Sequence, residues 1–210
     1  AKKLITRLNK KLGSRSIEFF PGVSYRHIMV WRGGHLPKST TPPHDISDKP
    51  IASHLPKGKK IDLLQTLMTE AQEILKTNNK TKANAIWLWG EGRPSKLAPF
   101  PMKGGLISAV DLVRGVGVLA GLDIIKVPRI TGFLDTNYKG KVDYALRCLK
   151  KYDFVFIHIE APDEAGHMGD VKKKIKAIED IDKKVVGPLL KGLEKLKPYR
   201  FLVTSDHATP

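Results

Sequence analysis

Two pairs of Asp and His stand out among the residues that could do chemistry. Asp163 and His167 follow the apolar segment 154–159, and Asp206 and His207 follow the apolar segment 201–204. Both segments have the composition of buried strands, so each pair is expected at the carboxyl end of a strand. Carboxylate oxygen and imidazole nitrogen bind divalent ions such as Mn²⁺ and Zn²⁺. The pattern therefore predicts two metal ions at one sheet edge, an arrangement suited to phosphoryl transfer.

A single Asp-His pair has other common uses, such as capping a helix or lying in an ordinary loop. Two pairs in equivalent positions after two strands favour the metal site. His158 differs from them because it lies within an apolar segment, so we expect a core histidine or a group that supports the ligands. Glu160 is expected to support the ligands as well.

Basic side chains in the first half could hold an anionic substrate. Arg93 lies in the glycine-rich segment 90–94, where backbone and guanidinium can approach an anion together, and the planar guanidinium suits phosphate and carboxylate. The other candidates are Arg26, His27, Arg32, His44 and Asp45. A solvated surface charge is an equal alternative for each arginine except Arg93, and His27 is a candidate proton carrier.

The elements that must position these residues alternate along the chain. In the first half, the patterns predict helices at 2–12 and 61–76, strands at 17–20 and 23–31, an irregular proline-rich loop at 35–60 and a short apolar run at 85–89. In the second half they predict strands from 106 and at 124–127, 154–159 and 201–204, with helices at 111–119, 142–150 and 171–196. This alternation indicates an α/β fold with a mostly parallel sheet.

The net charge of +16 is concentrated in the first half, where residues 1–98 carry 18 Lys and Arg against 7 Asp and Glu. Such an excess attracts nucleic acid, a membrane surface or a small phosphorylated substrate. No zinc-finger spacing, basic region before heptads or RNA-binding sheet signature supports nucleic acid. A single cysteine, Cys148, excludes an intrachain disulfide. With no apolar stretch long enough to span a bilayer and no leader at its start, a cytoplasmic protein is expected.

The segments around these residues resemble one family. Residues 153–170, DFVFIHIEAPDEAGHMGD, are similar to the metal-binding segment of the archaeal type of cofactor-independent phosphoglycerate mutase, in the alkaline phosphatase superfamily. Further similar segments are PGVSYRH at 21–27, TPPHDI at 41–46, WLWGEGRP at 87–94, SAVDLVRG at 108–115, LDTNY at 134–138 and TSDHATP at 204–210. The resemblance covers nearly the whole chain.

The resemblance implies an alkaline-phosphatase-like core sheet with helices on both faces and a smaller α/β domain inserted into it. Residues 1–98 correspond to the inserted substrate-clamping domain, incomplete at its N-terminal side, and residues 105–210 to part of the metal-binding domain. The family interconverts 3-phosphoglycerate and 2-phosphoglycerate through a phosphoserine. It uses two divalent ions, for which we expect Mn²⁺ before Mg²⁺, Co²⁺ or Zn²⁺, and no 2,3-bisphosphoglycerate.

In the family pattern, Asp163 and His167 match one metal site and Asp206 and His207 match the other. The nucleophilic serine, an early Asp and a later His have no counterpart in the chain, and Ser205 is not in the nucleophile's context. We therefore expect an internal fragment that is inactive alone. The connection at 97–104 is also shorter than the family's. The alternatives are another phosphatase or phosphomutase of the superfamily and a basic nucleic-acid-binding module. Partners beyond a small phosphorylated carboxylate are not expected, and the oligomeric state stays open.

Overall fold

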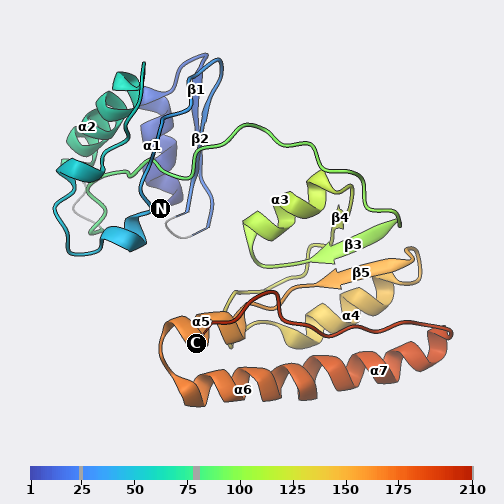
Figure 1. Cartoon of the computed structure of the whole chain (residues 1–210). Coiled ribbons are helices and arrows are strands. Elements are labelled where there is room, and N and C mark those ends of the chain that lie inside the picture. Colours follow the sequence, from blue (N-terminus) through green and yellow to red (C-terminus); the bar gives the residue numbers. More distant parts are fainter. Residues whose placement is uncertain (24–25, 78–80, 210) are drawn as a thin grey trace. The chain divides into compact units, whose positions relative to one another are not determined.

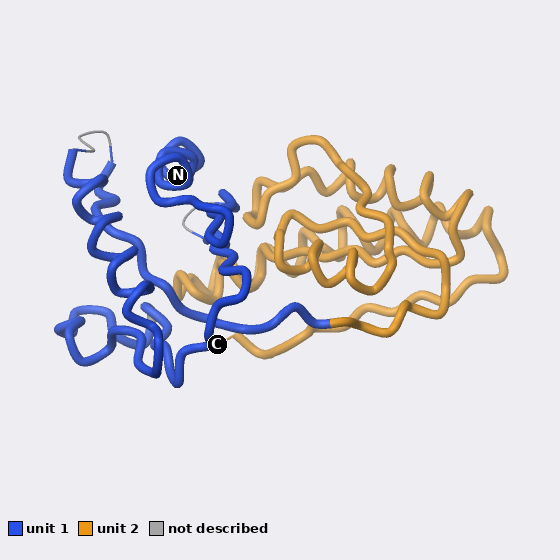
Figure 2. The backbone as a smooth tube through the Cα atoms, turned by 90° about the horizontal axis from the view of Figure 1, so that it is seen from above, with its two compact units in different colours: residues 1–95 blue, residues 96–210 orange. Residues whose placement is uncertain are grey.

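The computed structural model describes residues 1–23, 26–77 and 81–209, and the chain divides into two compact units, Ala1–Ser95 and Lys96–Pro210 (Figures 1 and 2). Each unit has a hydrophobic core of its own. The assignment of the first to substrate and of the second to metal stays a prediction.

Unit 1 packs two helices against a two-stranded hairpin. Its elements are α1 (Lys2–Leu12), β1 (Ile17–Phe20), β2 (Ile28–Trp31), the short 3₁₀ helices η1 (Pro43–Ile46) and η2 (Ala52–His54), and α2 (Asp62–Lys76). The strands are antiparallel, with Ile17 opposite Trp31. Each helix has an apolar stripe at helical spacing, and burial of that stripe drives its packing. The core comprises Ile5, Leu8, Ile17, Phe19, Leu67, Ala71 and Leu75.

The second strand expected in unit 1 is shorter in the structure. The strand expected at 23–31 begins only at Ile28, because the backbone N–H of Arg26 turns back to donate to Val23 O at 3.1 Å. Residues 24–25 of that segment lie outside the described residues. The apolar run 85–89 also forms no strand. Trp87 Nε1 donates to Thr41 O at 2.8 Å, so a side chain fixes this run on the proline-rich loop without a strand ladder.

Unit 2 contains the parallel sheet that the alternating pattern predicts. Its elements are β3 (Gly104–Ile107), α3 (Asp111–Leu119), β4 (Asp123–Ile124), α4 (Tyr138–Cys148), β5 (Phe154–Ile157), α5 (Ala161–His167), α6 (Val171–Ile181), the π-helical turn η3 (Asp182–Val186), α7 (Gly187–Leu193) and η4 (Glu194–Leu196). The strand order is β4-β3-β5, and both pairings are parallel.

Helices cover both faces of this sheet, as expected (Figure 1). Side chains of β3 alternate between the faces. A Cβ on Gly105 would lie 2.4 Å from Cys148 Sγ of α4, whereas a Cβ on Gly117 of α3 would lie 2.6 Å from Leu106 Cδ1. A side chain at either position would have to displace its neighbour, so glycine favours these two close approaches. Ile107 faces α4 and is fully buried, in the core of unit 2.

The helix expected at 171–196 is present: α6, the π-helical turn η3, α7 and η4 follow one another without a break in the helical backbone. One expectation for unit 2 needs correction. The segment 201–204 forms no strand and, in Figure 1, runs back from η4 toward α5. Strand formation needs a neighbouring backbone, and Leu202 in this segment is 83% exposed. In the described residues, no helix has the length and apolar content needed to cross a bilayer.

Candidate metal centre

Asp163 and His167 lie on helix α5 and not in the loop that the sequence suggested. The chain leaves β5 at Ile157 and enters α5 at Ala161, with Pro162 in the first turn, where its missing N–H costs nothing. Residues four apart on a helix share a face. Asp163 Oδ2 therefore lies 3.4 Å from His167 Nε2.

The C-terminal segment brings the second pair to the first. His207 Nε2 lies 4.0 Å from Asp163 Oδ1 and 3.7 Å from Asp206 Oδ2. Thr209 Oγ1 donates to Asp163 Oδ1 at 2.5 Å and lies 3.2 Å from His207 Nδ1. The backbone oxygen of Thr209 accepts from Lys174 Nζ on α6. The four predicted ligands thus form one cluster around Asp163, although the strand expected before Asp206 is absent from this described part of the chain.

The donor atoms of this cluster fit a divalent transition metal in kind. Two donors that bind one tetrahedral ion at about 2.1 Å lie about 3.4 Å from each other, which is the separation of Asp163 Oδ2 and His167 Nε2. The side chain of His167 is 69% exposed and can turn toward an ion. Among the described residues, no group of three or more His, Cys, Asp or Glu is arranged to hold a metal. Each pair therefore needs further ligands.

A half-buried histidine precedes the helix that carries the first pair. His158 lies between β5 and α5, with Nδ1 3.3 Å from Ser108 Oγ and Nε2 3.4 Å from Glu160 Oε2. Its carbonyl accepts from Lys141 Nζ at 2.8 Å. Burial and the Lys141 charge lower the pKa of His158, which favours a neutral imidazole. Such a ring can donate from Nε2 to Glu160 and accept from the Ser108 hydroxyl.

Sequence reasoning missed Lys141, Ser108 and Thr209. Burial lowers the pKa of Lys141 to about 8, and the residue is only 1% exposed. Lys141 stands in the same helical stripe as Tyr138, Val142 and Ala145, all of which are buried. A lysine within an apolar stripe was the signal that could have found it. For Thr209 and Ser108, only their places in the family-like segments set them apart.

The substrate candidates of unit 1 have separate local environments. Arg32 forms an ion pair with Glu18 across the hairpin, with 2.7 Å between Arg32 Nη2 and Glu18 Oε2. His27 Nδ1 accepts from the backbone N–H of Gly22 at 3.1 Å, and burial lowers the pKa of this histidine. Arg26 is exposed beside the same turn. His27 is therefore neutral near pH 7, with its Nδ1 already occupied.

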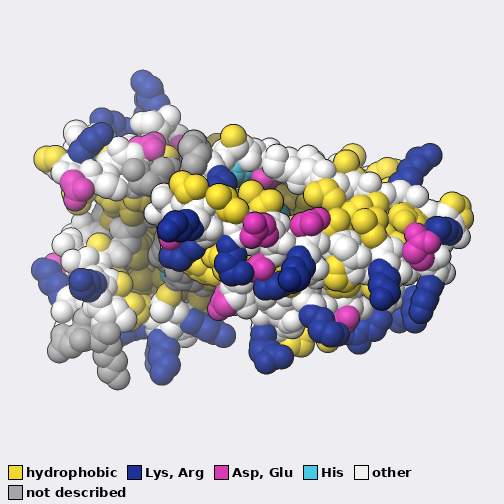
Figure 3. All heavy atoms as spheres, turned by 90° about the horizontal axis from the view of Figure 1, so that it is seen from below, with side chains coloured by type: hydrophobic (Ala, Val, Ile, Leu, Met, Phe, Trp, Pro, Cys, Tyr) yellow, Lys and Arg dark blue, Asp and Glu magenta, His cyan; other side chains and the backbone are white. Residues whose placement is uncertain are grey.

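Arg93 and Asp45 are exposed. Arg93 follows Gly90, whose φ of +68° favours glycine. The side chain of Arg93 forms no hydrogen bond or ion pair with the described residues. Asp45 lies in η1, and its backbone oxygen accepts from Lys49 Nζ at 3.2 Å. The side chain of His44 lies outside the described part of the structure. On the face drawn in Figure 3, Lys and Arg are interspersed with acidic and hydrophobic side chains.

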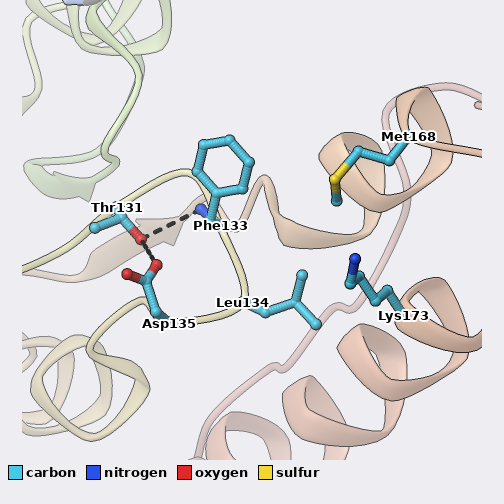
Figure 4. A pocket seen from close by; sticks show the side chains of 6 residues that line it. All are labelled: Thr131, Phe133, Leu134, Asp135, Met168 and Lys173. Atoms are coloured by element: carbon cyan, nitrogen blue, oxygen red, sulfur yellow. Dashed lines mark hydrogen bonds between the residues drawn. The ribbon is translucent and has the colours of Figure 1, made fainter. Parts of the chain in front are cut away.

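A pocket of about 430 Å³ lies next to α5 in unit 2 (Figure 4). Its lining consists of Thr131, Phe133, Leu134, Asp135, Met168 and Lys173. Thr131 Oγ1 donates to Asp135 at 2.7 Å, and Lys173 is paired with Asp170 at 3.0 Å. The lining is mostly apolar and its one cation is already paired. The pocket is therefore poorly suited to a phosphate, and none of the four predicted ligands lines it.

A parallel sheet covered on both faces, with paired Asp and His residues beyond a strand end, is the architecture of a metal-dependent α/β enzyme domain. The chain belongs to the metalloenzyme superfamily, whose family model matches residues 46–210. A second family model, described as 2,3-bisphosphoglycerate-independent phosphoglycerate mutase, matches residues 1–80. The family resemblance of the sequence motifs is thereby confirmed.

The chain is similar to curated proteins of the second family. Over its whole length, the chain is 50% identical to a probable 2,3-bisphosphoglycerate-independent phosphoglycerate mutase of Geobacter sulfurreducens and 44% identical to the Methanosarcina barkeri enzyme of that name. It spans 56% of the length of each. A solved cofactor-independent phosphoglycerate mutase from Thermoplasma acidophilum aligns with a TM-score of 0.49 at 20% identity, over 87% of this chain and 55% of that one.

Proposed function

We propose that this chain forms part of a cytoplasmic, Mn²⁺-dependent phosphoglycerate mutase that interconverts 3-phosphoglycerate and 2-phosphoglycerate without 2,3-bisphosphoglycerate. The observation that carries the proposal is the cluster of Asp163, His167, Asp206 and His207 in a member of the metalloenzyme superfamily. The whole chain is similar to enzymes of that name, which supports phosphoglycerate as the substrate.

The proposed roles follow from donor chemistry. Asp163 and His167 hold one divalent ion, and Asp206 and His207 hold the other. Bound ions of this kind stabilise the charge of a phosphoryl group during transfer. Thr209 orients the Asp163 carboxylate through its hydroxyl. The nucleophilic serine and the remaining ligands belong to residues beyond this chain.

Unit 1 is proposed to hold the substrate. Phosphoglycerate carries a phosphate and a carboxylate, and a guanidinium binds both through paired hydrogen bonds. Arg93 is the first candidate because its exposed side chain lies in the glycine-rich segment 90–94. The further candidates are Arg26, Arg32, His27, His44 and Asp45. Binding by Arg32 would require it to leave Glu18, an exposed ion pair that contributes little stability.

The experiment is Asp163→Asn in a full-length protein, which contains this chain and is as long as its relatives. We expect the Mn²⁺ affinity, measured by calorimetry, to fall at least about tenfold, because an amide is a weaker ligand than a carboxylate. Mutase activity should fall with it. The matched control is Asp143→Asn, which changes an exposed carboxylate paired with Lys139. Wild-type Mn²⁺ affinity in Asp163→Asn would refute the site.

The nearest rival is a phosphatase or a different phosphomutase of the same superfamily, which would use the same ligands. The wild-type protein should convert 3-phosphoglycerate to 2-phosphoglycerate with little release of inorganic phosphate. Release of phosphate as the main product would favour the phosphatase.

A further inference from the structure

Lys141 holds the backbone at the start of the segment that carries the first pair of predicted ligands. It lies on the buried face of α4, and its Nζ donates to the carbonyl of His158 at 2.8 Å. Its acceptor is a neutral carbonyl. A methionine would fill a similar volume without burying a charge, so the specific contribution of the ammonium is this contact.

Two other groups of His158 are also held in place, its backbone N–H and its ring. Its N–H donates to Ile107 O at 2.8 Å, which extends the ladder between β3 and β5 by one residue. Its ring lies between Ser108 and Glu160. Ser108 is fixed in turn, because its backbone oxygen accepts from Arg114 Nε at 2.7 Å. The carbonyl of His158 is thus held two residues before Glu160, the N-cap residue of α5.

The ligands follow directly from this point. Glu160 is the N-cap residue of α5, and its backbone oxygen accepts from the N–H groups of Asp163 at 2.9 Å and Glu164 at 3.1 Å. Moving the end of β5 would therefore move the first turn of α5 and the Asp163 carboxylate. A displacement of a few tenths of an ångström is enough to weaken a metal site whose ligand distances are narrow.

We propose that Lys141 is a positioning residue for the metal centre, which fixes the junction between β5 and α5 through the carbonyl of His158. The inference rests on the proposed function, since Asp163 and His167 are ligands only there.

The test is Lys141→Met in the full-length protein. We expect the fold to be kept, by circular dichroism and thermal unfolding, and the Mn²⁺ affinity to fall about tenfold, as for other groups that orient ligands. In the metal-free protein, amide hydrogen exchange of residues 158–164 should become faster. The matched control is Lys139→Met on the same helix, whose ammonium is exposed and paired with Asp143. Lys139→Met should change neither the Mn²⁺ affinity nor the amide exchange of residues 158–164.

Unchanged exchange and Mn²⁺ affinity in Lys141→Met would overturn the inference. If Lys141→Met fails to fold, Lys141→Gln keeps a donor without the charge. Recovery of both the fold and the Mn²⁺ affinity in Lys141→Gln would support the inference, because the donor to the carbonyl of His158 is kept. Recovery of the fold without the affinity, or failure of both variants to fold, would overturn it. Failure of the proposed function can be distinguished from failure of this inference. A wild-type protein that binds no Mn²⁺ refutes the function, whereas the exchange at 158–164 still tests the role of Lys141.

Discussion

Lys141 is the largest fully buried side chain of the described residues, and its position has a consequence for pH. Burial lowers its pKa from 10.5 to about 8 in the folded state. Below pH 8 both folded and unfolded states carry the proton, so the folded state bears the full cost of the buried charge. Between pH 8 and 10.5 the folded state has lost the proton and the unfolded state keeps it, so the free energy of unfolding rises with pH.

We therefore predict that Lys141 makes the protein more stable as pH rises from 8 to 10.5, by up to about 3 kcal/mol. The measurement is urea unfolding of wild type and Lys141→Met at several pH values. Their difference removes the contribution of other groups that titrate in this range, such as Tyr138 and Cys148, whose pKa values are raised. A difference that does not change between pH 7.5 and 10 would contradict the prediction.

At the scale of elements, α2 stabilises unit 1 through one face. Leu67 is 3% exposed and packs in the core with Leu8 and Phe19, whereas Leu63, one turn earlier on the same helix, is 38% exposed. Removal of buried methyl groups costs their transfer free energy and leaves a cavity.

We predict that Leu67→Ala lowers the free energy of unfolding of unit 1 by about 2–5 kcal/mol. Leu63→Ala is the control and should cost less than about 1 kcal/mol, because its side chain already contacts water. Urea denaturation followed by circular dichroism measures both. Equal losses in the two variants would contradict the difference in burial between Leu63 and Leu67.

At the scale of the whole molecule, the two hydrophobic cores are separate, and each lies within one unit. Changes in one core should therefore leave the other intact. We predict that Ile107→Ala, which opens a cavity at a fully buried position of unit 2, speeds amide exchange in β3 and α4. Exchange in α1 and α2 should stay at the wild-type rate in the same sample. Faster exchange in both units would show that the chain unfolds as one body.

The sequence determined the elements whose signals are local. The helices at 2–12, 62–76 and 111–119 follow from apolar spacing, and the parallel sheet follows from the alternation of strands and helices. The four candidate metal ligands could be named because carboxylate and imidazole groups follow apolar segments and lie in family-like motifs. Their roles as ligands stay predictions.

Only the tertiary structure decided the rest, because it depends on partners distant in sequence. Residues 85–89 and 201–204 have the composition of strands, yet a strand forms only beside another backbone that can accept its hydrogen bonds. The contact of Thr209 with Asp163 joins residues 46 apart. Lys141 looks like any other lysine among 37 basic residues until packing of α4 on the sheet buries it against His158. Composition sets which side chains are available, whereas burial decides which of them interact strongly.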